Sequence, residues 1–385
     1  MTKTIRNMFA VVAIAATTMV FASCKHETSE DFSDENAAAV TAQFVDHTVA
    51  PTYTALAANA EQLASQLAAL KANPTDNGVQ QVCATFLAAR EQWEKSEAFL
   101  FGAAGDFGID PHIDSWPLDE NAFNTLMNSP AMLDALDDEN GDVVAGENLG
   151  NALLGFHGIE YILFRNGQPR SASDITGDQW KYVVAVAGDL RNRCYQLEAG
   201  WLGDATPESH LAKLDEMELP YTVANGDYSY GENMKNAGKA GSTYVSRIAA
   251  LVAIVQGCVD IADEVGSSKI YAAWNGEDIT YIESPYSYMS ITDFKNNIIS
   301  IQNVYMGGVE GERDNSRSLH SLVSKIDSDL DNKVTAAIAN ALSKIEAMPA
   351  PFAQHYNDPQ NGEAVEACST LSDTLNEVIE AIRNN

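Results

Sequence analysis

Apolar residues recur at alternating steps of three and four along most of the chain. One series runs from Tyr53 to Leu70, and a longer one runs from Trp180 to Trp201. Series of the same kind cover 244–258, 319–345 and 365–382. This spacing places the apolar side chains on one face of an α-helix. Alternating β-branched runs of strand length are nearly absent from the sequence, so the pattern predicts an all-α fold of long amphipathic helices joined into bundles.

The helical series form two groups, separated by a segment whose apolar pattern is poor. We predict a helical bundle domain over 37–205, a connecting segment over 206–239 and a second helical bundle domain over 240–385. Each half carries an irregular aromatic insert, and each closes a helix with aromatic residues and a glycine, at Gly102 and at Gly307. The sequence therefore predicts two four-helix-bundle-like domains and leaves open an origin by internal duplication.

Residues 1–23 have the pattern of a bacterial signal peptide, with a basic start and an apolar stretch, Met8–Phe21, too short to span a bilayer stably. The segment Val20–Cys24 resembles the lipobox of bacterial lipoproteins. That resemblance implies cleavage before Cys24 and lipidation of this residue, which would anchor the protein to the outer membrane, on its periplasmic face or at the cell surface. An ordinary secretory signal with an incidental cysteine is the alternative. Residues 24–36 are polar and acidic, and they predict a solvated tether.

The composition is strongly acidic, with 54 Asp and Glu residues against 23 Lys and Arg residues and a formal net charge of −31. Such a surface repels phosphate backbones and anionic lipid headgroups. This excludes nucleic acid as a partner and leaves the lipid anchor as the only expected contact with a membrane. Apolar residues make up 45% of the chain, which is enough to bury a large core.

Four cysteines follow the lipobox, far apart in the chain and without a CxxC pair, so a zinc knuckle or a thioredoxin-type motif is absent. Each falls on the apolar stripe of an expected helix, where cysteine behaves as a small hydrophobic residue. We predict buried free thiols, with oxidation of one pair in an exported protein as the alternative. The four are Cys83, Cys194, Cys258 and Cys368.

The helix that contains Phe86 carries charges on its apolar face. Arg90 and Glu97 fall on the same stripe as two large aromatic residues, Phe86 and Trp93. Burying such charges costs several kcal/mol per ion unless they are paired or meet a ligand. An internal ion pair of Arg90 with Glu94 or Glu97 and a functional site both explain the pattern.

The segment 149–164 predicts a central helix that buries both an imidazole and a carboxylate. Glu160 lies on an apolar stripe among large side chains, and His157 precedes it by three residues, so both can point at one locus. Gly155 and Gly158 weaken this helix, which favours a position that another backbone or a ligand must approach closely. A lone buried histidine is usually a hydrogen-bonded core residue, but this combination favours a functional site.

The same segment carries a family resemblance. Gly155–Glu160 resembles the GxHxxE signature of the imelysin family of bacterial envelope proteins. Arg90–Gly102 resembles the R-x-x-W-x-x-[ST]-E-x-F-x-F-G segment of that family, and Asp114–Pro117 resembles its D-x-W-P element. In the second half, elements of the types S-x-x-S, F-x-N-[IL] with Y-x-G, and P-x-P-F resemble 284–287, 294–307 and 349–352. The resemblance covers essentially residues 37–384.

What the resemblance implies is an all-helical, two-domain fold with the signature near the cleft between the domains. It also implies a role in iron uptake or regulation, in a family first described as metallopeptidases. The signature residues carried over are Gly155, His157 and Glu160. Residues implied to lie nearby are Arg90, Trp93, Glu97, Asp114 and Trp116, with Ser284, Ser287 and Asn297 completing the site from the second half.

A metal site formed by His157, Glu160, Glu97 and Asp114 is chemically sensible. It is rich in carboxylates, which suits iron, manganese or calcium more than zinc. Zinc peptidases on helical frameworks use HExxH or HxxEH, and here Tyr161 stands where the second histidine of HxxEH would be. The sequence shows no general base or water geometry for peptide hydrolysis.

We therefore expect an imelysin-like lipoprotein that binds a metal ion or small ligand between its domains and serves iron uptake. An envelope iron-transport protein is the expected partner. A metallopeptidase with His157 and Glu160 as its catalytic pair is the second hypothesis, and whether the protein is an enzyme stays open. A non-catalytic scaffold for an envelope transport complex is the third.

Overall fold

The computed structural model describes residues 33–385, so the predicted signal peptide, Cys24 and most of the predicted tether lie outside the described residues. The regular secondary structure of the described chain is helical, apart from one short antiparallel pair of strands, β1 (Phe164–Arg165) and β2 (Gln168–Pro169). This confirms the prediction of an all-α fold.

The α-helices follow one another with short connections. In chain order they are α1 (Asp34–Phe44), α2 (Ala50–Ala72), α3 (Asp76–Glu94), α4 (Ala103–Asp106), α5 (Ile109–Ile113), α6 (Glu120–Met127), α7 (Pro130–Leu136), α8 (Gly141–Asn148), α9 (Gly155–Leu163), α10 (Gly177–Leu202), α11 (Glu208–Glu216), α12 (Tyr230–Lys235), α13 (Arg247–Glu264), α14 (Tyr271–Trp274), α15 (Ser290–Tyr305), α16 (Leu319–Ile326), α17 (Ser328–Glu346), α18 (Phe352–His355) and α19 (Asn361–Arg383).

Short 3₁₀-helical and π-helical turns join these α-helices. One π-helical turn, Val45–Val49, makes α1 and α2 a single rod, and a second, Val265–Ile270, joins α13 to α14. The 3₁₀ turns are Glu97–Phe99, Asn151–Leu153, Ala172–Asp174, Gly203–Ala205, Val223–Asn225 and Asn315–Arg317.

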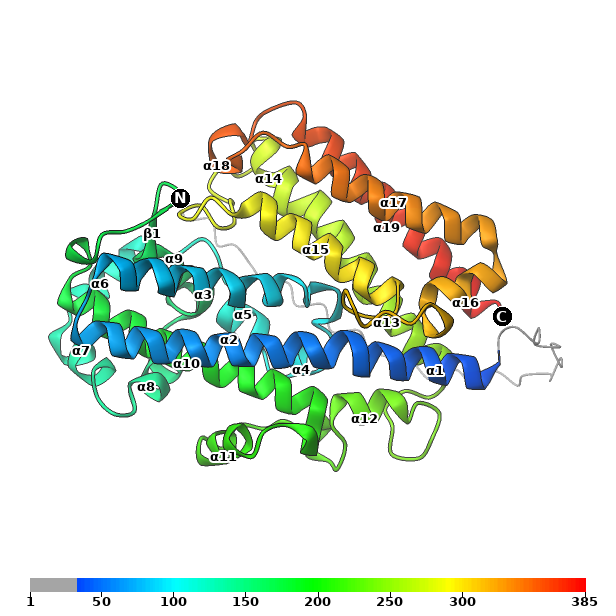
Figure 1. Ribbon diagram of the computed structural model, residues 1–385, viewed down its shortest axis with the longest axis horizontal. Coiled ribbons are helices and arrows are strands. Elements are labelled where there is room, and N and C mark those ends of the chain that lie inside the picture. Colours follow the sequence, from blue (N-terminus) through cyan, green and yellow to red (C-terminus); the bar gives the residue numbers. More distant parts are fainter. Residues whose placement is uncertain (1–32) are drawn as a thin grey trace, which may run out of the picture.

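The long helices lie in two groups (Figure 1). In the first group α2 packs on α3 and α10, and in the second α19 packs on α13 and α17. Helix α15 packs on α13 and α17 and also contacts α3, so it connects the two groups. Buried apolar side chains from both groups form one connected core. The domain boundaries and the duplication stay predictions.

The series 319–345 was expected to be one helix, and that expectation is wrong. The chain leaves the helical conformation at Asp327, whose side chain accepts hydrogen bonds from the N–H groups of Asp329 and Leu330. A short acceptor at this position caps a new helix, so α16 ends and α17 begins there. The connecting segment 206–239 contains α11 and α12.

The described cysteines, Cys83, Cys194, Cys258 and Cys368, are all buried and free. Burial raises the pKa of each thiol, to about 12 for Cys83 and Cys368. These are the unreactive buried thiols that the apolar stripes predict.

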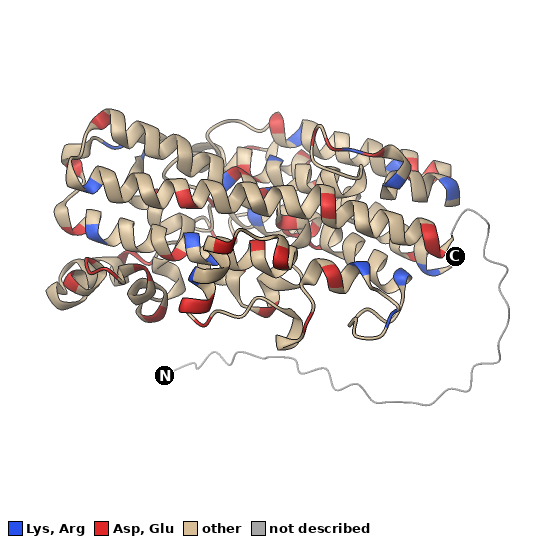
Figure 2. Ribbon diagram, turned by 60° about the horizontal axis from the view of Figure 1, so that its bottom comes forward, with Lys and Arg blue, Asp and Glu red and all other residues tan. Residues whose placement is uncertain are grey.

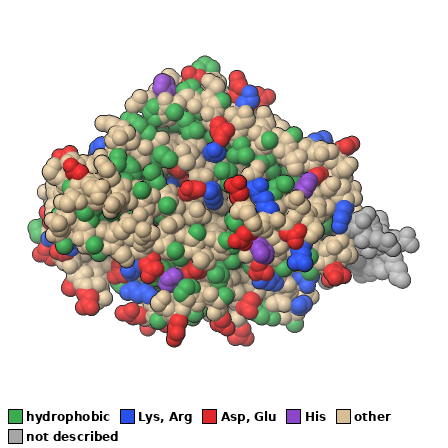
Figure 3. All heavy atoms as spheres, in the orientation of Figure 1, with side chains coloured by type: hydrophobic (Ala, Val, Ile, Leu, Met, Phe, Trp, Pro, Cys, Tyr) green, Lys and Arg blue, Asp and Glu red, His purple; other side chains and the backbone are tan. Residues whose placement is uncertain are grey.

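Charged groups are spread widely over the molecule. Asp and Glu residues occur along most helices and loops, and Lys and Arg residues are fewer (Figure 2). In the space-filling view, acidic side chains lie across the whole visible face (Figure 3). In the described part of the chain, no helix combines the length and the apolar character that crossing a membrane requires.

Candidate functional site

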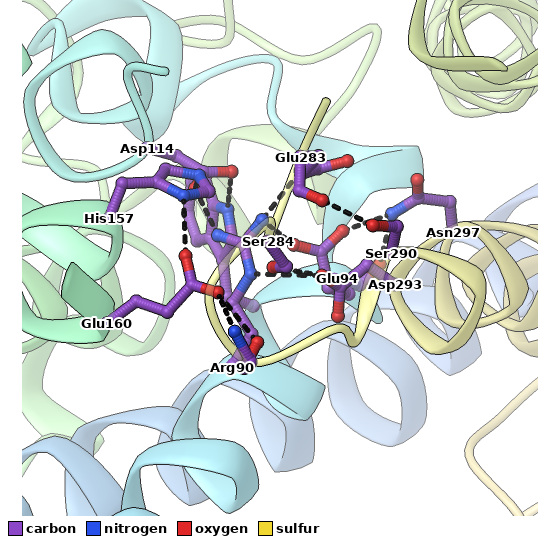
Figure 4. A network of polar contacts seen from close by, with 12 residues as sticks. Arg90, Glu94, Asp114, His157, Glu160, Glu283, Ser284, Ser290, Asp293 and Asn297 are labelled. Carbon is purple, nitrogen blue, oxygen red and sulfur yellow. Dashed lines mark hydrogen bonds and ion pairs between the residues drawn. The ribbon is translucent and has the colours of Figure 1, made fainter. Parts of the chain in front are cut away.

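A cluster of charged side chains lies buried where α3, α9 and the start of α15 meet (Figure 4). At its centre is Arg90 of α3, which is 2% exposed. Its Nη2 lies 2.5 Å from Glu94 Oε1 and donates to Glu283 Oε1 at 2.6 Å. Its Nη1 donates to Asp114, and its guanidinium lies over the ring of Phe156. Arg90 therefore joins carboxylates that are far apart in the sequence.

The end of α3 differs from the predicted stripe. Helix α3 ends at Glu94, and Glu97 lies in the following 3₁₀ turn rather than one turn further along the same helix. The ion pair that forms is therefore Arg90 with Glu94 and not Arg90 with Glu97. Glu97 is nevertheless buried, and its Oε1 lies 3.9 Å from Lys269 Nζ.

Helix α9 begins at Gly155, so the predicted helix over 149–164 starts six residues too early. Gly155 has a φ of +65°, and a Cβ there would lie 1.8 Å from the carbonyl oxygen of Ile113. Only glycine tolerates both this conformation and this close approach. The contact sets the start of α9 against the chain that leads into Asp114, and it thereby positions His157.

His157 lies between two carboxylates. Its Nε2 lies 3.1 Å from Asp114 Oδ1 and its Nδ1 lies 3.5 Å from Glu160 Oε2. Burial alone would lower the pKa of His157, but Asp114 and Glu160 outweigh it and raise the pKa to about 9. Burial would raise the pKa of Asp114, but Arg90 and His157 hold it well below its usual value. Trp93 Nε1 donates to the second oxygen of Asp114 at 2.6 Å.

Glu160 of α9 accepts hydrogen bonds from the loop before α15, which holds the loop against this helix. Its Oε1 accepts hydrogen bonds from the Tyr286 N–H at 3.1 Å, from the Ser287 N–H at 2.7 Å and from Ser287 Oγ at 2.7 Å. Three donors use this oxygen, so only Oε2 remains to face His157. Ser287 therefore contributes to the site by donating hydrogen bonds to Glu160.

Ser284 and Asn297 also support carboxylates. Ser284 Oγ donates to Asp293 Oδ2 at 2.5 Å, and Asn297 Nδ2 donates to Glu94 Oε2 at 2.5 Å. Such hydrogen bonds hold the carboxylates in fixed orientations. The residues predicted from the second half therefore do reach this region, as orienting groups.

Carboxyl groups outnumber basic groups in this cluster. Its permanent cations are Arg90 and Lys269, with His157 as a third group that can be charged. Burial raises the pKa of Glu94 and Glu97, and it raises the pKa of Asp293 to about 7. Buried charge of one sign is costly unless protons or another cation neutralise it. The buried acids of the cluster are Glu94, Glu97, Asp114, Glu160, Glu283 and Asp293.

Two sets of ligand atoms in the described chain are close enough to hold a metal ion. Asp114, His157 and Glu283 form one set, and Glu94, Glu97 and Asp114 form the other, with the atoms of each set within 4.8 Å of one another. Glu283 is fully buried, and among the described residues its Oε2 has no hydrogen-bond partner. An unused buried carboxylate oxygen is the kind of acceptor that a cation satisfies.

The structure places three of the four predicted metal ligands in these sets. Asp114 belongs to both sets, His157 to one and Glu97 to the other, whereas Glu160 belongs to neither. The sequence interpretation missed Glu283 as a ligand. This residue lies in an irregular insert, where no helical period marks a buried position, and its only signal is that it directly precedes Ser284.

Lys269 and Asp293 were missed as well. Lys269 is 1% exposed, but it follows Ser267 and Ser268 on the π-helical turn Val265–Ile270, so the local sequence does not mark it as a buried cation. Asp293 lies in the first turn of α15, where an acid is ordinary for a helix N-terminus, so nothing in the sequence distinguishes it.

A pocket of about 240 Å³ opens beside the cluster. The ring of Trp116 forms part of its wall and lies 5.0 Å from the ring of Tyr281 and 5.8 Å from that of His157. Glu97 and Asp114 of the second ligand set line this pocket. Its charged lining residues are Glu97, Asp110, Asp114, Glu264 and Lys269.

Comparisons with known proteins find relatives that cover most of the chain. The family model described as Imelysin matches residues 49–378. The chain is 27% identical over 339 residues to iron-regulated protein A of Synechococcus elongatus, covering 86% of this chain and 83% of that protein. A crystal structure described as an iron-regulated protein A precursor from Parabacteroides distasonis has a TM-score of 0.77 at 28% identity, covering 91% of this chain and 96% of that one.

An imelysin-like protein from Psychrobacter arcticum shares the fold at 12% identity. Its crystal structure has a TM-score of 0.58 and covers 91% of this chain and 94% of that one. The cluster around Arg90 and His157 lies within the residues that the family model matches.

Proposed function

The chain belongs to the imelysin family, and from this premise we propose that it binds a divalent metal ion at the buried acidic cluster and serves iron acquisition. The protein is exported and anchored to the outer membrane through lipidated Cys24. The observation that carries the metal proposal is the surplus of buried carboxylates, with Glu283 Oε2 unpartnered among the described residues. The names of the relatives from Synechococcus elongatus and Parabacteroides distasonis support iron as the biological ion.

The donor chemistry fits such an ion. Asp114 and Glu283 offer oxygen atoms and His157 offers one imidazole nitrogen, and no thiolate lies in either set. Carboxylate-rich sites with one imidazole suit iron(II) or manganese(II), whereas structural zinc sites favour sulfur and several imidazoles. A bound ion would supply the positive charge that the cluster lacks.

The remaining residues of the cluster orient the ligands. Trp93 Nε1 and Arg90 Nη1 both donate to Asp114, and Glu160 Oε2 faces the His157 nitrogen that points away from Asp114. A carboxylate behind a ligating imidazole fixes its orientation and raises its basicity. Because His157 carries a proton in the ion-free protein, binding of a metal ion releases that proton.

Metal analysis of protein purified without chelator tests the proposal, together with titration calorimetry using iron(II) without oxygen, manganese(II), calcium and zinc. We expect one ion per chain, with affinity reduced about 10–100-fold or more in Glu283→Gln and His157→Gln. The matched control is His210→Gln, which removes a buried imidazole outside the cluster and should leave the affinity unchanged. Equal absence of bound metal in the wild type and in both site variants, at saturating metal, would overturn the proposal.

The geometry supports peptide hydrolysis less well. Three hydrogen bonds engage Glu160 Oε1 with the loop before α15, so Glu160 is poorly placed to activate a water molecule as a general base. Cleavage of a peptide library by the wild type, abolished in Glu160→Gln, would favour the peptidase. An envelope protein that co-purifies with both site variants would favour the scaffold.

A further inference from the structure

Lys269 occupies an unusual position in the fold. It lies on the π-helical turn Val265–Ile270, and such turns occur frequently at functional sites. Its side chain is 1% exposed, yet it forms part of the wall of the 240 Å³ pocket. A lysine is rarely buried to this extent without a specific set of partners.

The ammonium group of Lys269 has carboxylates on several sides. Its Nζ donates to Glu283 Oε1 at 3.1 Å and lies 3.9 Å from Glu97 Oε1 and 4.0 Å from Glu94 Oε2. These acids come from α3, from the turn after it and from the loop before α15, and each belongs to one of the two ligand sets. The ammonium therefore stands where convergent oxygen atoms would hold a cation.

Arg90, the other buried cation, is held much more firmly. Its guanidinium makes short contacts to Glu94, Asp114 and Glu283 and lies over the Phe156 ring. Lys269 has one hydrogen bond of ordinary length and a flexible four-carbon stem, and its Nζ lies 5.1 Å from the centre of the Trp116 ring in the pocket wall. Of the two cations, Lys269 is the one that can leave without dismantling the cluster.

We propose that Lys269 is a displaceable counter-ion, which holds the cation position of the acidic cluster until a divalent metal ion entering through the pocket replaces it. The displaced ammonium moves to Asp110 and Glu264, which are the carboxylates of the pocket wall that belong to neither ligand set. Exchange of a single charge for a double charge neutralises more of the carboxylate surplus, so divalent ions displace Lys269 and monovalent ions do not. This inference rests on the proposed function.

Chemical labelling of lysines in the wild-type protein tests the exchange directly. An amine-specific acylating reagent is applied with and without saturating manganese(II), and labelled peptides are measured by mass spectrometry. We expect Lys269 to be protected without metal and labelled at least several-fold more with metal. Lys333, whose side chain is 61% exposed, serves as the internal control and should react equally in both states.

Two results of this experiment have separate meanings. If manganese(II) binds and Lys269 stays protected, the exchange is wrong while the proposed function stands. If neither manganese(II) nor the other ions bind, the proposed function itself fails, and the exchange fails with it.

The variant Lys269→Met provides a second readout, because it removes the competing charge and keeps the length of the side chain. We expect its affinity for manganese(II) to rise about tenfold or more, since a like charge within about 4 Å opposes the ion. Lys333→Met is the matched control and should bind as the wild type does. Unchanged or weaker binding by a folded Lys269→Met, with circular dichroism like that of the wild type, would contradict the exchange.

Discussion

Two buried histidines of this protein have very different surroundings. His210 of α11 pairs with Glu198 of α10, with its Nδ1 2.6 Å from Glu198 Oε2, and its ring stacks on that of Tyr195 at 3.7 Å. One buried acid there meets one imidazole, and the nearby Glu61 is largely exposed. His157, by contrast, belongs to a cluster with six buried acids and two permanent cations.

The contrast shows which buried polar groups are neutralised by their own protein partners. The Glu198–His210 pair can satisfy its own charge, and it links two helices without needing a ligand. In the cluster around His157 the carboxyl groups outnumber the basic groups even when the imidazole is protonated, so bound protons or a further cation must complete the neutralisation. Incomplete neutralisation of a buried cluster, rather than burial of a histidine as such, is what indicates a cation site.

The largest expected effect comes from removing the central cation of the cluster. Arg90→Met leaves several buried carboxylates without their shared partner, so we expect it to lower the free energy of unfolding by about 3–5 kcal/mol. The comparison variant His210→Gln disturbs one balanced pair and should cost about 1–3 kcal/mol. Urea unfolding measures both, and equal losses would remove the distinction between the two regions.

The pH dependence of metal-free protein should be almost as large. The pKa of His157 is raised to about 9, so its contribution is fully present below about pH 6.5 and is lost as the pH rises through 9. The pKa of Asp293 is raised to about 7, so its contribution is present below about pH 4 and is lost as the pH rises through 7. Both changes have the same sign.

We therefore expect the free energy of unfolding to fall between pH 6 and pH 9, by about 3 kcal/mol from His157 alone. Urea unfolding in chelator at several pH values measures this change. His157→Gln should lack most of the decrease above pH 7, whereas His210→Gln should retain it. A wild-type stability that rises over this range would contradict the assigned charge of His157.

Metal binding should stabilise the protein by a smaller amount. At a free metal concentration of about 100 times Kd, we expect a gain of about 2.7 kcal/mol and a higher Tm. Glu283→Gln should lose this shift, and Glu198→Gln should keep it, because Glu198 lies outside both ligand sets. A thermal shift that depends on Glu198 as strongly as on Glu283 would show that the ion binds elsewhere.

The smallest effect separates an orienting role of Glu160 from a ligand role. Ser287→Ala removes one of three donors to Glu160 Oε1 and leaves the two N–H donors, so we expect a loss of about 1 kcal/mol of stability. Metal affinity should change by less than about threefold. An affinity loss as large as that of Glu283→Gln would instead place Glu160 among the ligands.

Much of this architecture follows from local patterns. Apolar periodicity identified the long helices α2, α10 and α19, and it marked Arg90, His157 and Glu160 as charged groups on buried faces. Periodicity works there because a helix repeats its burial every three to four residues, whatever it packs against. Helix ends were less predictable, as at Glu94 and Gly155, because a distant contact or a cap decides them.

Two members of the cluster, Glu283 and Lys269, were revealed by packing alone. Glu283 lies in a loop and Lys269 on a π-helical turn, two settings without a period that would reveal a buried side chain. Each reaches Arg90 or its carboxylates across more than 150 residues of sequence. Whether a buried charge is balanced depends on which groups the fold brings within a few ångströms of it. The spacing of residues along the chain does not reveal which charged groups will surround a given side chain in the folded protein.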